Sequence, residues 1–179
     1  KPMKLEVNES IELMLLNESH APEIYNLAKD NREYLSQWLT WPPFMESQDF
    51  IANFIKGSMD RNSRGEEYGF SIFYNNVIVG RIGVHKIDLH NRIGEIGYWI
   101  GAEYEGKGIM MQSCESIVQF CFHFLKLNRI EIKCGTENYK SQNIPKKLNF
   151  SEEGIIREGE FLRTGYIDLY LYSLLKSEL

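Results

Sequence analysis

The stretch YEGKGIMMQS, from Tyr104 to Ser113, contains residue types whose spacing suits the binding of an anion. Gly106 and Gly108 flank Lys107, and an apolar helical pattern follows at once. Glycine has no Cβ, so its backbone can approach a ligand closely, and the first turn of a helix carries unpaired N–H groups and a partial positive charge. Together with the Lys107 ammonium these groups predict a cradle for a phosphate or diphosphate. The alternative is a plain tight turn between a strand and a helix.

Two common phosphate-binding loops do not fit this stretch. A dinucleotide-binding fingerprint needs a third glycine and a parallel strand before it, whereas the strand before Gly106 is expected to lie in an antiparallel meander. The spacing of a Walker P-loop is absent. The context still favours a phosphate site, because the glycines directly follow an expected strand, Arg92 to Ile100, and directly open an amphipathic helix.

The elements that position this stretch are predicted from hydrophobic periodicity. Alternating apolar residues indicate strands, and apolar residues at steps of three and four indicate helices. Asn75-Asn76, between two strands, tolerates the positive φ of a tight hairpin turn, and Ser47 resembles a helix N-cap. Strands are expected at residues 11–16, 68–74, 77–88, 92–100, 129–134, 150–157 and 167–175, and helices at 20–29, from 47 onward, from 110 to about 127, and at 141–148.

The order of these elements predicts a single α+β domain over residues 1–179. A strand, two helices, a three-stranded meander, a helix, a strand, a helix and two strands fit one mainly antiparallel sheet with helices on both faces. Strands 92–100 and 129–134 enclose a helix, so we expect them to be parallel neighbours. The predicted sheet has seven strands.

Composition and charge argue against several classes of protein. The chain has 25 Asp and Glu against 20 Lys and Arg, a formal net charge of −5, so direct binding of nucleic acid through a broad basic surface is not expected. No apolar run approaches the roughly 18 residues of a membrane span, and no secretory leader opens the sequence. Cys114, Cys121 and Cys134 form no disulfide framework and no zinc-ligand spacing, which predicts a cytoplasmic protein with packed cysteines and no metal site.

Two longer segments resemble the GNAT superfamily of acetyl-CoA-dependent N-acetyltransferases. They are GEIGYWIGAEYEGKGIMMQS and, after a helix, LNRIEIKCGTENYKSQNIPKKLNF. The resemblance covers nearly the whole chain in element order and looks closest to the Rim-type branch, which acetylates the N-terminal amines of ribosomal proteins. It implies a GNAT-like sheet in which the central parallel pair splays apart, and acetyl-CoA as the cofactor.

In this family the phosphate loop reads Gln/Arg-x-x-Gly-x-Gly/Ala. We align it with Glu105-Gly106-Lys107-Gly108-Ile109-Met110, and the resemblance implies that these six residues bind acetyl-CoA. Two positions depart from the pattern. Glu105 replaces Gln or Arg, so its side chain would repel a diphosphate while its backbone N–H can still donate. Met110 replaces a small residue and lies on the apolar stripe of the helix.

The second motif of the family is Asn-x-x-Ser followed by Lys-Leu-Gly-Phe. It corresponds to Asn138-Tyr139-Lys140-Ser141 and Lys147-Leu148-Asn149-Phe150. Asn149 stands where Gly is usual, and we expect the helix to end there in the left-handed conformation that Asn tolerates. Pro145 lies inside this helix, where it removes the hydrogen bond to the carbonyl of Ser141 and is expected to kink the first turn.

The resemblance also implies where the pantetheine arm of acetyl-CoA lies. It would run between the diverging strands Glu95 to Ile100 and Arg129 to Cys134, like a short extra strand. One backbone N–H of the first strand would polarise the thioester carbonyl and stabilise the charge that develops during attack. Backbone groups of the first strand and its end, and Asn138 from the other side, are expected to hold the arm. The residues are Trp99, Ile100, Gly101 and Asn138.

Two carboxylates are candidates for the base that takes a proton from the attacking amine. Glu160, in REGEFLRTGY, stands in the position of a proposed base in the Rim-type branch, and Glu95 lies on the strand where other GNAT branches keep a catalytic carboxylate. For each, a solvated or ion-paired surface Glu is the alternative. Many relatives have a Tyr acid where Pro145 stands. Ser141 is the expected substitute, by a hydrogen bond to the leaving thiolate. The alternative is a helix N-cap, and one hydroxyl can serve both roles.

The acceptor amine is expected to bind beside an aromatic stretch, EYLSQWLTWPPF, in which two prolines stop any helix. Aromatic side chains near prolines suit a shaped binding wall, and a lid over the core or a dimer contact is the alternative. The residues expected to form this wall are Tyr34, Trp38, Trp41 and Phe44.

The function implied is transfer of an acetyl group from acetyl-CoA to a primary amine, with the N-terminal α-amine of a ribosomal protein as the leading acceptor. An α-amine, with a pKa of about 7.7–8.0, is partly neutral near physiological pH, whereas a lysine amine at about 10.4 needs more help. The alternatives are a small amine, such as a polyamine or aminoglycoside, and a non-catalytic acyl-CoA-binding module. Relatives often dimerise, so a homodimer is a further expectation.

Overall fold

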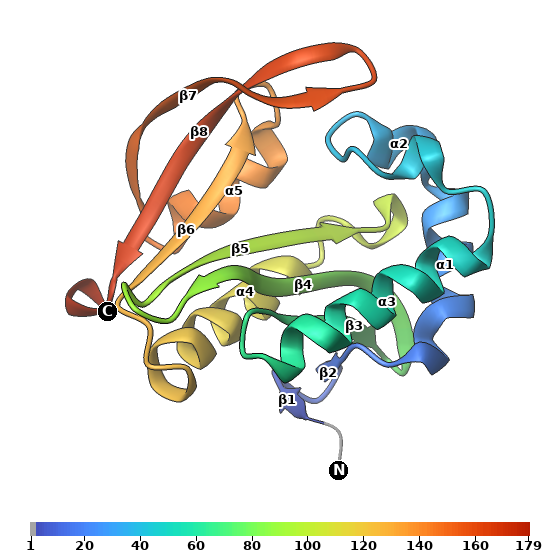
Figure 1. Cartoon of the computed structure of the whole chain (residues 1–179), viewed down its shortest axis with the longest axis horizontal. Helices are drawn as coiled ribbons and strands as arrows, with labels where there is room; N and C mark the ends of the chain where they lie inside the picture. The colour runs from blue at the N-terminus through green and yellow to red at the C-terminus, as the bar shows by residue number, and fades with distance from the viewer. Residues whose placement is uncertain (1–2) are drawn as a thin grey trace.

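A computed structural model describes residues 3–179 and shows a mixed α+β fold built on a single sheet (Figure 1). The sheet has eight strands in the order β1-β2-β3-β4-β5-β6-β8-β7, and every neighbouring pair is antiparallel except β5–β6. The strands are β1 (Lys4–Glu6), β2 (Ile11–Leu15), β3 (Tyr68–Tyr74), β4 (Val77–Asp88), β5 (Ile93–Ile100), β6 (Arg129–Gly135), β7 (Ser151–Leu162) and β8 (Gly165–Leu175).

The predicted fold is confirmed except for the number of strands. The expectation of seven strands was wrong because β1, only three residues long, adds an edge strand beside β2. Its sequence Lys-Leu-Glu is too short to show a period of two. Strand β7 is also longer than expected and reaches Leu162, so Glu160 lies within a strand.

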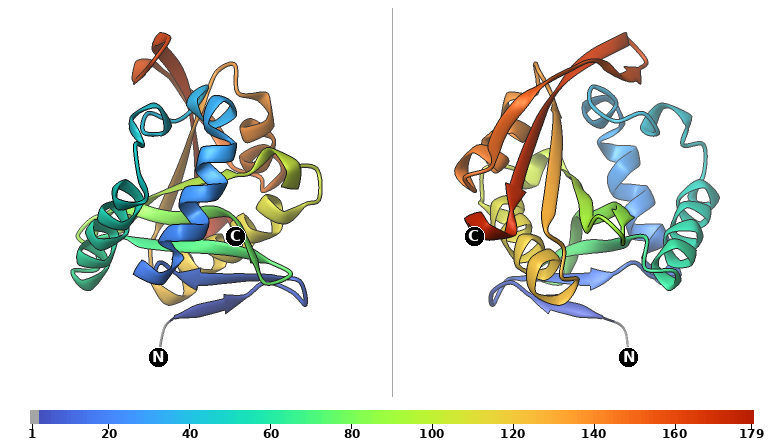
Figure 2. Two further views of the ribbon diagram at one scale, coloured as in Figure 1. Left: turned by 90° about the vertical axis from the view of Figure 1, so that its right-hand side faces the viewer. Right: turned by 60° about the vertical axis from the view of Figure 1, so that its left-hand side comes forward.

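Helices cover both faces of the sheet, as Figure 2 shows. The longer ones are α1 (Ala21–Asp30), α2 (Arg32–Ser36), α3 (Gln48–Ser63), α4 (Ile109–Gln119) and α5 (Tyr139–Lys147), and α4 continues into a π-helical turn, η4 (Phe120–Phe124). Short 3-10 turns lie at η1 (Glu18–His20), η2 (Pro42–Phe44), η3 (Ala102–Tyr104) and η5 (Lys176–Glu178). None of the helices in residues 3–179 is long and apolar enough to cross a bilayer.

Each face of the sheet has its own apolar core. One core joins the strands to α4 and includes the buried thiols of Cys114, Cys121 and Cys134, which are all free. The other core joins α1 and α3 to the sheet, and Trp99 of β5 belongs to it. Successive side chains of a strand point to opposite faces, so β5 sends Ile96 into the first core and Trp99 into the second.

Local backbone signals of the sequence are found where they were expected. Asn75 and Asn76 have φ of 48° and 68°, as a tight hairpin turn between β3 and β4 requires. Asn149 has φ of 64° and ends α5. There Asn149 N donates to Lys146 O and Phe150 N donates to Pro145 O, the pair of bonds that closes a helix with a left-handed residue.

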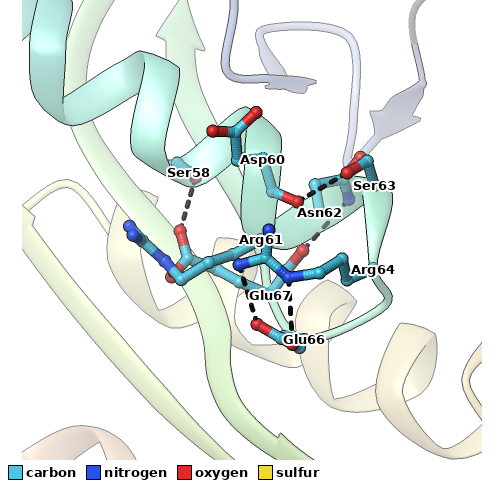
Figure 3. Close-up of polar contacts among 8 residues, drawn as sticks. All are labelled: Ser58, Asp60, Arg61, Asn62, Ser63, Arg64, Glu66 and Glu67. Atoms are coloured by element: carbon cyan, nitrogen blue, oxygen red, sulfur yellow. Dashed lines mark hydrogen bonds and ion pairs between the residues drawn. The ribbon is translucent and has the colours of Figure 1, made fainter.

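A polar cluster ties the end of α3 to the start of β3 (Figure 3). Glu67 accepts hydrogen bonds from Ser58 Oγ and, at 2.9 Å, from Arg61 Nε, and its backbone carbonyl accepts one from Asn62 Nδ2 at 3.0 Å. These contacts fix α3 against the meander that carries β4 and β5. Ser47, expected as the N-cap at the other end of α3, occupies that position but makes no side-chain capping bond.

Candidate active site

Strands β5 and β6 diverge, as Figure 1 shows, and the site lies between them. They pair in parallel only from Ile93↔Arg129 to Ile96↔Ile132. Beyond this point β5 stays bonded to β4 as far as Gly80↔Ile100, and β6 stays bonded to β8 as far as Gly135↔Leu169. Beyond the short ladder, each strand is therefore hydrogen-bonded to its other neighbour, and the edges of β5 and β6 that face each other are unpaired. A cavity of about 890 Å³, within the range of ligand sites, opens at this gap.

Backbone alternation decides which residues of β5 face the gap. Gly101 N donates to Val79 O at 2.9 Å, in register with the β4–β5 ladder. In an antiparallel pair the residues bonded to the neighbour alternate, so the peptide groups of Trp99 and Gly101 point toward β4. Those of Tyr98 and Ile100 point into the gap. The peptide groups of Trp99 and Gly101, which were expected to hold the arm of acetyl-CoA, thus point toward β4, whereas those of Ile100, and of Tyr98, which was not expected, face the gap. Binding of the arm at these positions stays a prediction.

The glycine stretch ends in an open helix start that lines the same cavity. Gly106 and Gly108 have φ of 77° and 75°, and a Cβ added at Gly106 would meet no atom within 4 Å. Gly108 is the N-cap of α4, has no side chain to cap it, and accepts the first helical bond from Gln112 N. The N–H groups of the preceding turn are consequently free to bind an anion.

The two unusual residues of this loop have identifiable partners. Glu105 Oε2 lies 3.4 Å from Lys140 Nζ, and the same carboxylate is a hydrogen-bond partner of Tyr34, whose pKa is raised by burial and by that contact. Met110 is buried in the α4 core. Lys107 is exposed and is not among the residues that line the cavity. The negative charge of Glu105 is thus partly neutralised beside the loop.

Glu95 is held by close contacts with a lysine and a histidine. Its Oε1 lies 2.9 Å from Lys133 Nζ and its Oε2 lies 3.2 Å from His85 Nε2. Burial alone raises the pKa of this carboxyl, but hydrogen bonds and charges from His85 and Lys133 outweigh burial and hold the pKa at about 2. A carboxylate with so low a pKa is a weak base, which disfavours Glu95 for proton abstraction.

Glu160 has the opposite electrostatic environment. It is on β7, opposite Ile167 of β8, and lines the cavity. Burial raises the pKa of its carboxyl, the nearby charge of Glu95 raises it further, and Lys86 and Lys133 oppose these effects in part. A carboxylate whose pKa is shifted toward neutrality is better suited to accept a proton near pH 7.

Replacing Glu95 by glutamine is expected to lower the free energy of unfolding at pH 7 by about 1–3 kcal/mol, because it leaves the Lys133 ammonium without its partner. The folded-state pKa of Glu95 is depressed from 4.5 to about 2. Its stabilisation is therefore fully present above about pH 4.5 and is lost as the pH falls toward 2. Urea unfolding of wild type and E95Q across this range measures the difference.

The matched control for this experiment is Glu12→Gln, which breaks a more exposed ion pair of Glu12 with Lys4 at 3.2 Å. Exposed pairs contribute about 0–1 kcal/mol. Equal losses for E95Q and E12Q, or a loss for E95Q that stays constant down to pH 2, would show that Glu95 is not specially stabilised.

Ser141 lies in the first turn of α5 rather than at its cap. Asn138 is the N-cap, and its Oδ1 accepts a long hydrogen bond, 3.4 Å, from Ser141 N. The alternative role of Ser141 as the N-cap is thereby wrong. Its Oγ is 3.4 Å from both Cys134 Sγ and Tyr98 Oη. The hydroxyl of Ser141 thus reaches the inner side of the gap, where Asn138, Tyr98 and Cys134 also line the cavity.

Only part of the predicted aromatic wall reaches the cavity. Tyr34 and Trp38, from α2 and the turn after it, line it. Trp41 instead packs against Phe50 of α3, at 6.4 Å between ring centroids, and against Trp99. Phe44 is 71% exposed and does not line the cavity. Trp41 and Phe44 therefore lie outside the cavity lining, and their contact with an acceptor stays a prediction.

Several lining residues were missed by sequence reasoning. Tyr98 and Cys134 looked like ordinary core positions of strands, and His85 and Lys133 like their solvent faces. A signal was available in the sequence, because each of two otherwise apolar strands has a charged residue on one face. Side chains alternate between the two faces along a strand, and this alternation places Glu95 of β5 and Lys133 of β6 on the same face. Among residues 3–179 no cluster of three or more His, Cys, Asp or Glu side chains is arranged to hold a metal ion.

A splayed parallel pair beside an uncapped, glycine-led helix defines the class of transferases that hold an acyl thioester between two strands. Comparison with known proteins names the family: residues 11–151 match the Acetyltransferase (GNAT) domain. The chain is 31% identical over 169 residues to the ribosomal-protein-serine acetyltransferase of Escherichia coli K12, with 94% of each chain covered. The chain belongs to the GNAT family of acetyltransferases, which use acetyl-CoA.

Further relatives agree with the Rim-type branch. The putative ribosomal N-acetyltransferase YdaF of Bacillus subtilis 168 is 36% identical over 177 residues, covering 96% of this chain and 94% of that protein. The solved structure of RimL, a ribosomal L7/L12 α-N-protein acetyltransferase in complex with coenzyme A through a cysteine disulfide, superposes with a TM-score of 0.95 at 28% identity, covering 99% and 100% of the two chains.

Proposed function

We propose that this chain transfers the acetyl group of acetyl-CoA to the N-terminal α-amine of a ribosomal protein. The observation that carries the proposal is the gap between β5 and β6, which has an anion-binding helix start at one end and the carboxylate of Glu160 in its wall. The name of RimL states an α-N-protein acceptor, ribosomal L7/L12, and the name of the Escherichia coli relative states the serine of a ribosomal protein.

The residues of the chain fit acetyl-CoA, which supplies an activated acetyl thioester. The free N–H groups at the start of α4 would bind its diphosphate, and the inward peptide groups of Tyr98 and Ile100 would orient its arm. Glu160 would take the proton of the attacking amine. The hydroxyl of Ser141 would donate to the departing sulfur, because its Oγ reaches the inner side of the gap beside Cys134.

We propose further that the family's phosphate-loop pattern is aligned two residues earlier than the sequence reading placed it. The pattern has glycine at its fourth and sixth positions, and it then runs from Glu103 to Gly108. Its glycines fall on Gly106 and Gly108, which both have positive φ. In this alignment Met110 lies outside the pattern, consistent with its burial in the core. Only Glu103, in place of Gln or Arg, then departs from the family.

The charges of the cavity favour an α-amine over a polyamine. Three acidic residues line the cavity, and two of them are paired: Glu95 with Lys133 and His85, and Glu105 with Lys140. Glu160 has no ion-pair partner within the described residues 3–179. A polyamine brings at least two positive charges and would need further free carboxylates, whereas a peptide N-terminus brings one.

A panel of acceptors tests this proposal. We expect acetyl transfer, measured as thiol release, to a peptide with the N-terminal sequence of ribosomal protein L7/L12, and none to the same peptide with a blocked N-terminus. Spermidine should react at least tenfold more slowly at equal concentration. Turnover of spermidine with the peptides untouched would favour the small-amine function, and tight CoA binding without transfer to any acceptor would favour a non-catalytic module.

The setting of such a reaction would be the cytoplasm, where ribosomal proteins are made. The three free, buried thiols are compatible with this compartment, because no pair of them forms a disulfide in the described structure. Burial raises the pKa of Cys134, so its thiol is protonated at neutral pH although it lines the cavity.

A further inference from the structure

Pro145 leaves a carbonyl of α5 without its helical partner. The helix runs from Tyr139 to Lys147 with Pro145 in its interior. Proline has no N–H, so the carbonyl of Ser141, four residues earlier, cannot receive the usual backbone hydrogen bond. An unpaired carbonyl at a partly buried position costs free energy and loosens the turn that carries it.

Tyr98 supplies the missing donor from across the gap. Its Oη donates to Ser141 O at 2.9 Å, although the two residues are 43 positions apart in the sequence. Tyr98 is on β5 and Ser141 is on α5, which follows β6. This bond therefore joins β5 to the helix that follows the diverging strand β6. Both residues line the cavity. Burial raises the pKa of the Tyr98 phenol well above its usual value, so the hydroxyl keeps its proton.

The rest of the α5 start is anchored to its own strand. Asn138 caps Ser141 N, and Gln142 Nε2 donates to Gly135 O at 2.8 Å and to Thr136 O at 3.0 Å. These bonds hold the helix to the end of β6. The Tyr98 hydroxyl adds a hydrogen bond from β5 to the first turn of the helix.

We propose that Tyr98 is a positioning residue that sets the distance of Ser141 from β5 and so places the Ser141 hydroxyl at the reacting sulfur. Tyr98 is needed in this role because Pro145 has no N–H to donate to the carbonyl of Ser141. This inference rests on the proposed function in one respect, the catalytic use of Ser141, whereas the coupling of Tyr98 to Pro145 does not depend on turnover. The competing role for Tyr98 is direct proton donation to the thiolate.

A double-mutant cycle tests the proposal. We expect Tyr98→Phe to lower kcat by about 5–50-fold, because it orphans the Ser141 carbonyl, with KM for acetyl-CoA changed less than threefold. Pro145→Ala restores a backbone N–H to that carbonyl. In the P145A background, Y98F should therefore lower kcat less than threefold. An equal loss in both backgrounds would overturn the proposal, since a direct proton donor cannot be replaced by a backbone N–H.

Amide hydrogen exchange separates this inference from the proposed function, because it needs no substrate. Y98F should speed exchange in residues 139–147, and the double variant Y98F/P145A should restore protection. Unchanged exchange in Y98F would refute the coupling even if the enzyme is active, and restored protection without any acetyl transfer would refute only the function. If Y98F fails to fold, the double variant must fold and protect residues 139–147 for the coupling to stand.

The matched control is Tyr172→Phe. Tyr172 is also a buried tyrosine, but its hydroxyl has no hydrogen-bond partner within the described residues, and it does not line the cavity. Its removal should change neither kcat nor exchange in α5. A loss as large as that of Y98F would show that any buried hydroxyl of this core has the same effect, and the proposed role of Tyr98 would then fail.

Discussion

Replacing Glu160 by glutamine is expected to lower kcat by about 10²–10³-fold while the affinity for coenzyme A stays within twofold of wild type. Glutamine has nearly the same shape but cannot accept a proton, and a positioned general base contributes about 10²–10⁴-fold. Glu160 is the lining carboxylate whose pKa is raised, whereas that of Glu95 is held at about 2. Steady-state kinetics with the peptide acceptor and calorimetry with coenzyme A measure the two quantities.

The pH dependence makes this test sharper. A base must be ionised to act, so the wild-type kcat/KM should fall as the pH drops through the raised pKa of Glu160, and E160Q should lack this acid limb. Both proteins should keep a rise toward the pKa of the acceptor amine, about 7.7–8.0, because the amine must be neutral.

The matched control is Glu158→Gln, the same change two positions along β7 at an exposed residue that does not line the cavity. It should leave kcat and the acid limb unchanged. An E160Q enzyme that works at the wild-type rate would remove Glu160 as the base, and water would then have to accept the proton, since Glu95 is too weak a base.

The sequence was sufficient to predict features that depend only on residues close together along the chain. Asn75-Asn76 and Asn149 were placed correctly in positive-φ turns because few residues tolerate that conformation. The apolar stripe after Gly108 identified α4, because steps of three and four leave one buried helix face. The divergence of β5 and β6 was implied by the family resemblance, not by any local pattern, and the short ladder confirms it.

Contacts between distant segments could not be predicted in the same way. The loss of a helical bond at Pro145 is local and was predicted, but its replacement by Tyr98 joins two elements that only the folded sheet brings together. The pairing of Glu95 with His85 and Lys133 likewise needs the register of three strands. The sequence offered Glu160 first and Glu95 second as the base, and the opposite electrostatic environments of the two carboxylates appear only once those partners are known.

Gly108→Val is expected to weaken coenzyme A binding by about 10–100-fold. Gly108 has φ of 75°, a conformation that a β-branched residue rarely adopts, and it is the N-cap of α4. Valine would push the backbone out of this conformation and place methyl groups where a phosphate must approach. Losing one or two charge-assisted hydrogen bonds, about 1.5–3 kcal/mol each, gives a change of this size. Isothermal titration calorimetry with coenzyme A measures it.

Gly108→Val strains the backbone as well as blocking the ligand, and the control variant Gly65→Val separates the two effects. Gly65 has φ of 73°, nearly the same as Gly108, but it lies in the turn after α3 and does not line the cavity. Both variants should therefore lower the free energy of unfolding by similar amounts, and only G108V should bind coenzyme A more weakly. Equal affinities for G108V and wild type would mean that the diphosphate is not bound by the backbone at the start of α4. In that event the gap between β5 and β6 would lack the anchor that aims an acetyl thioester into it, and the proposed transferase mechanism would lose its physical basis.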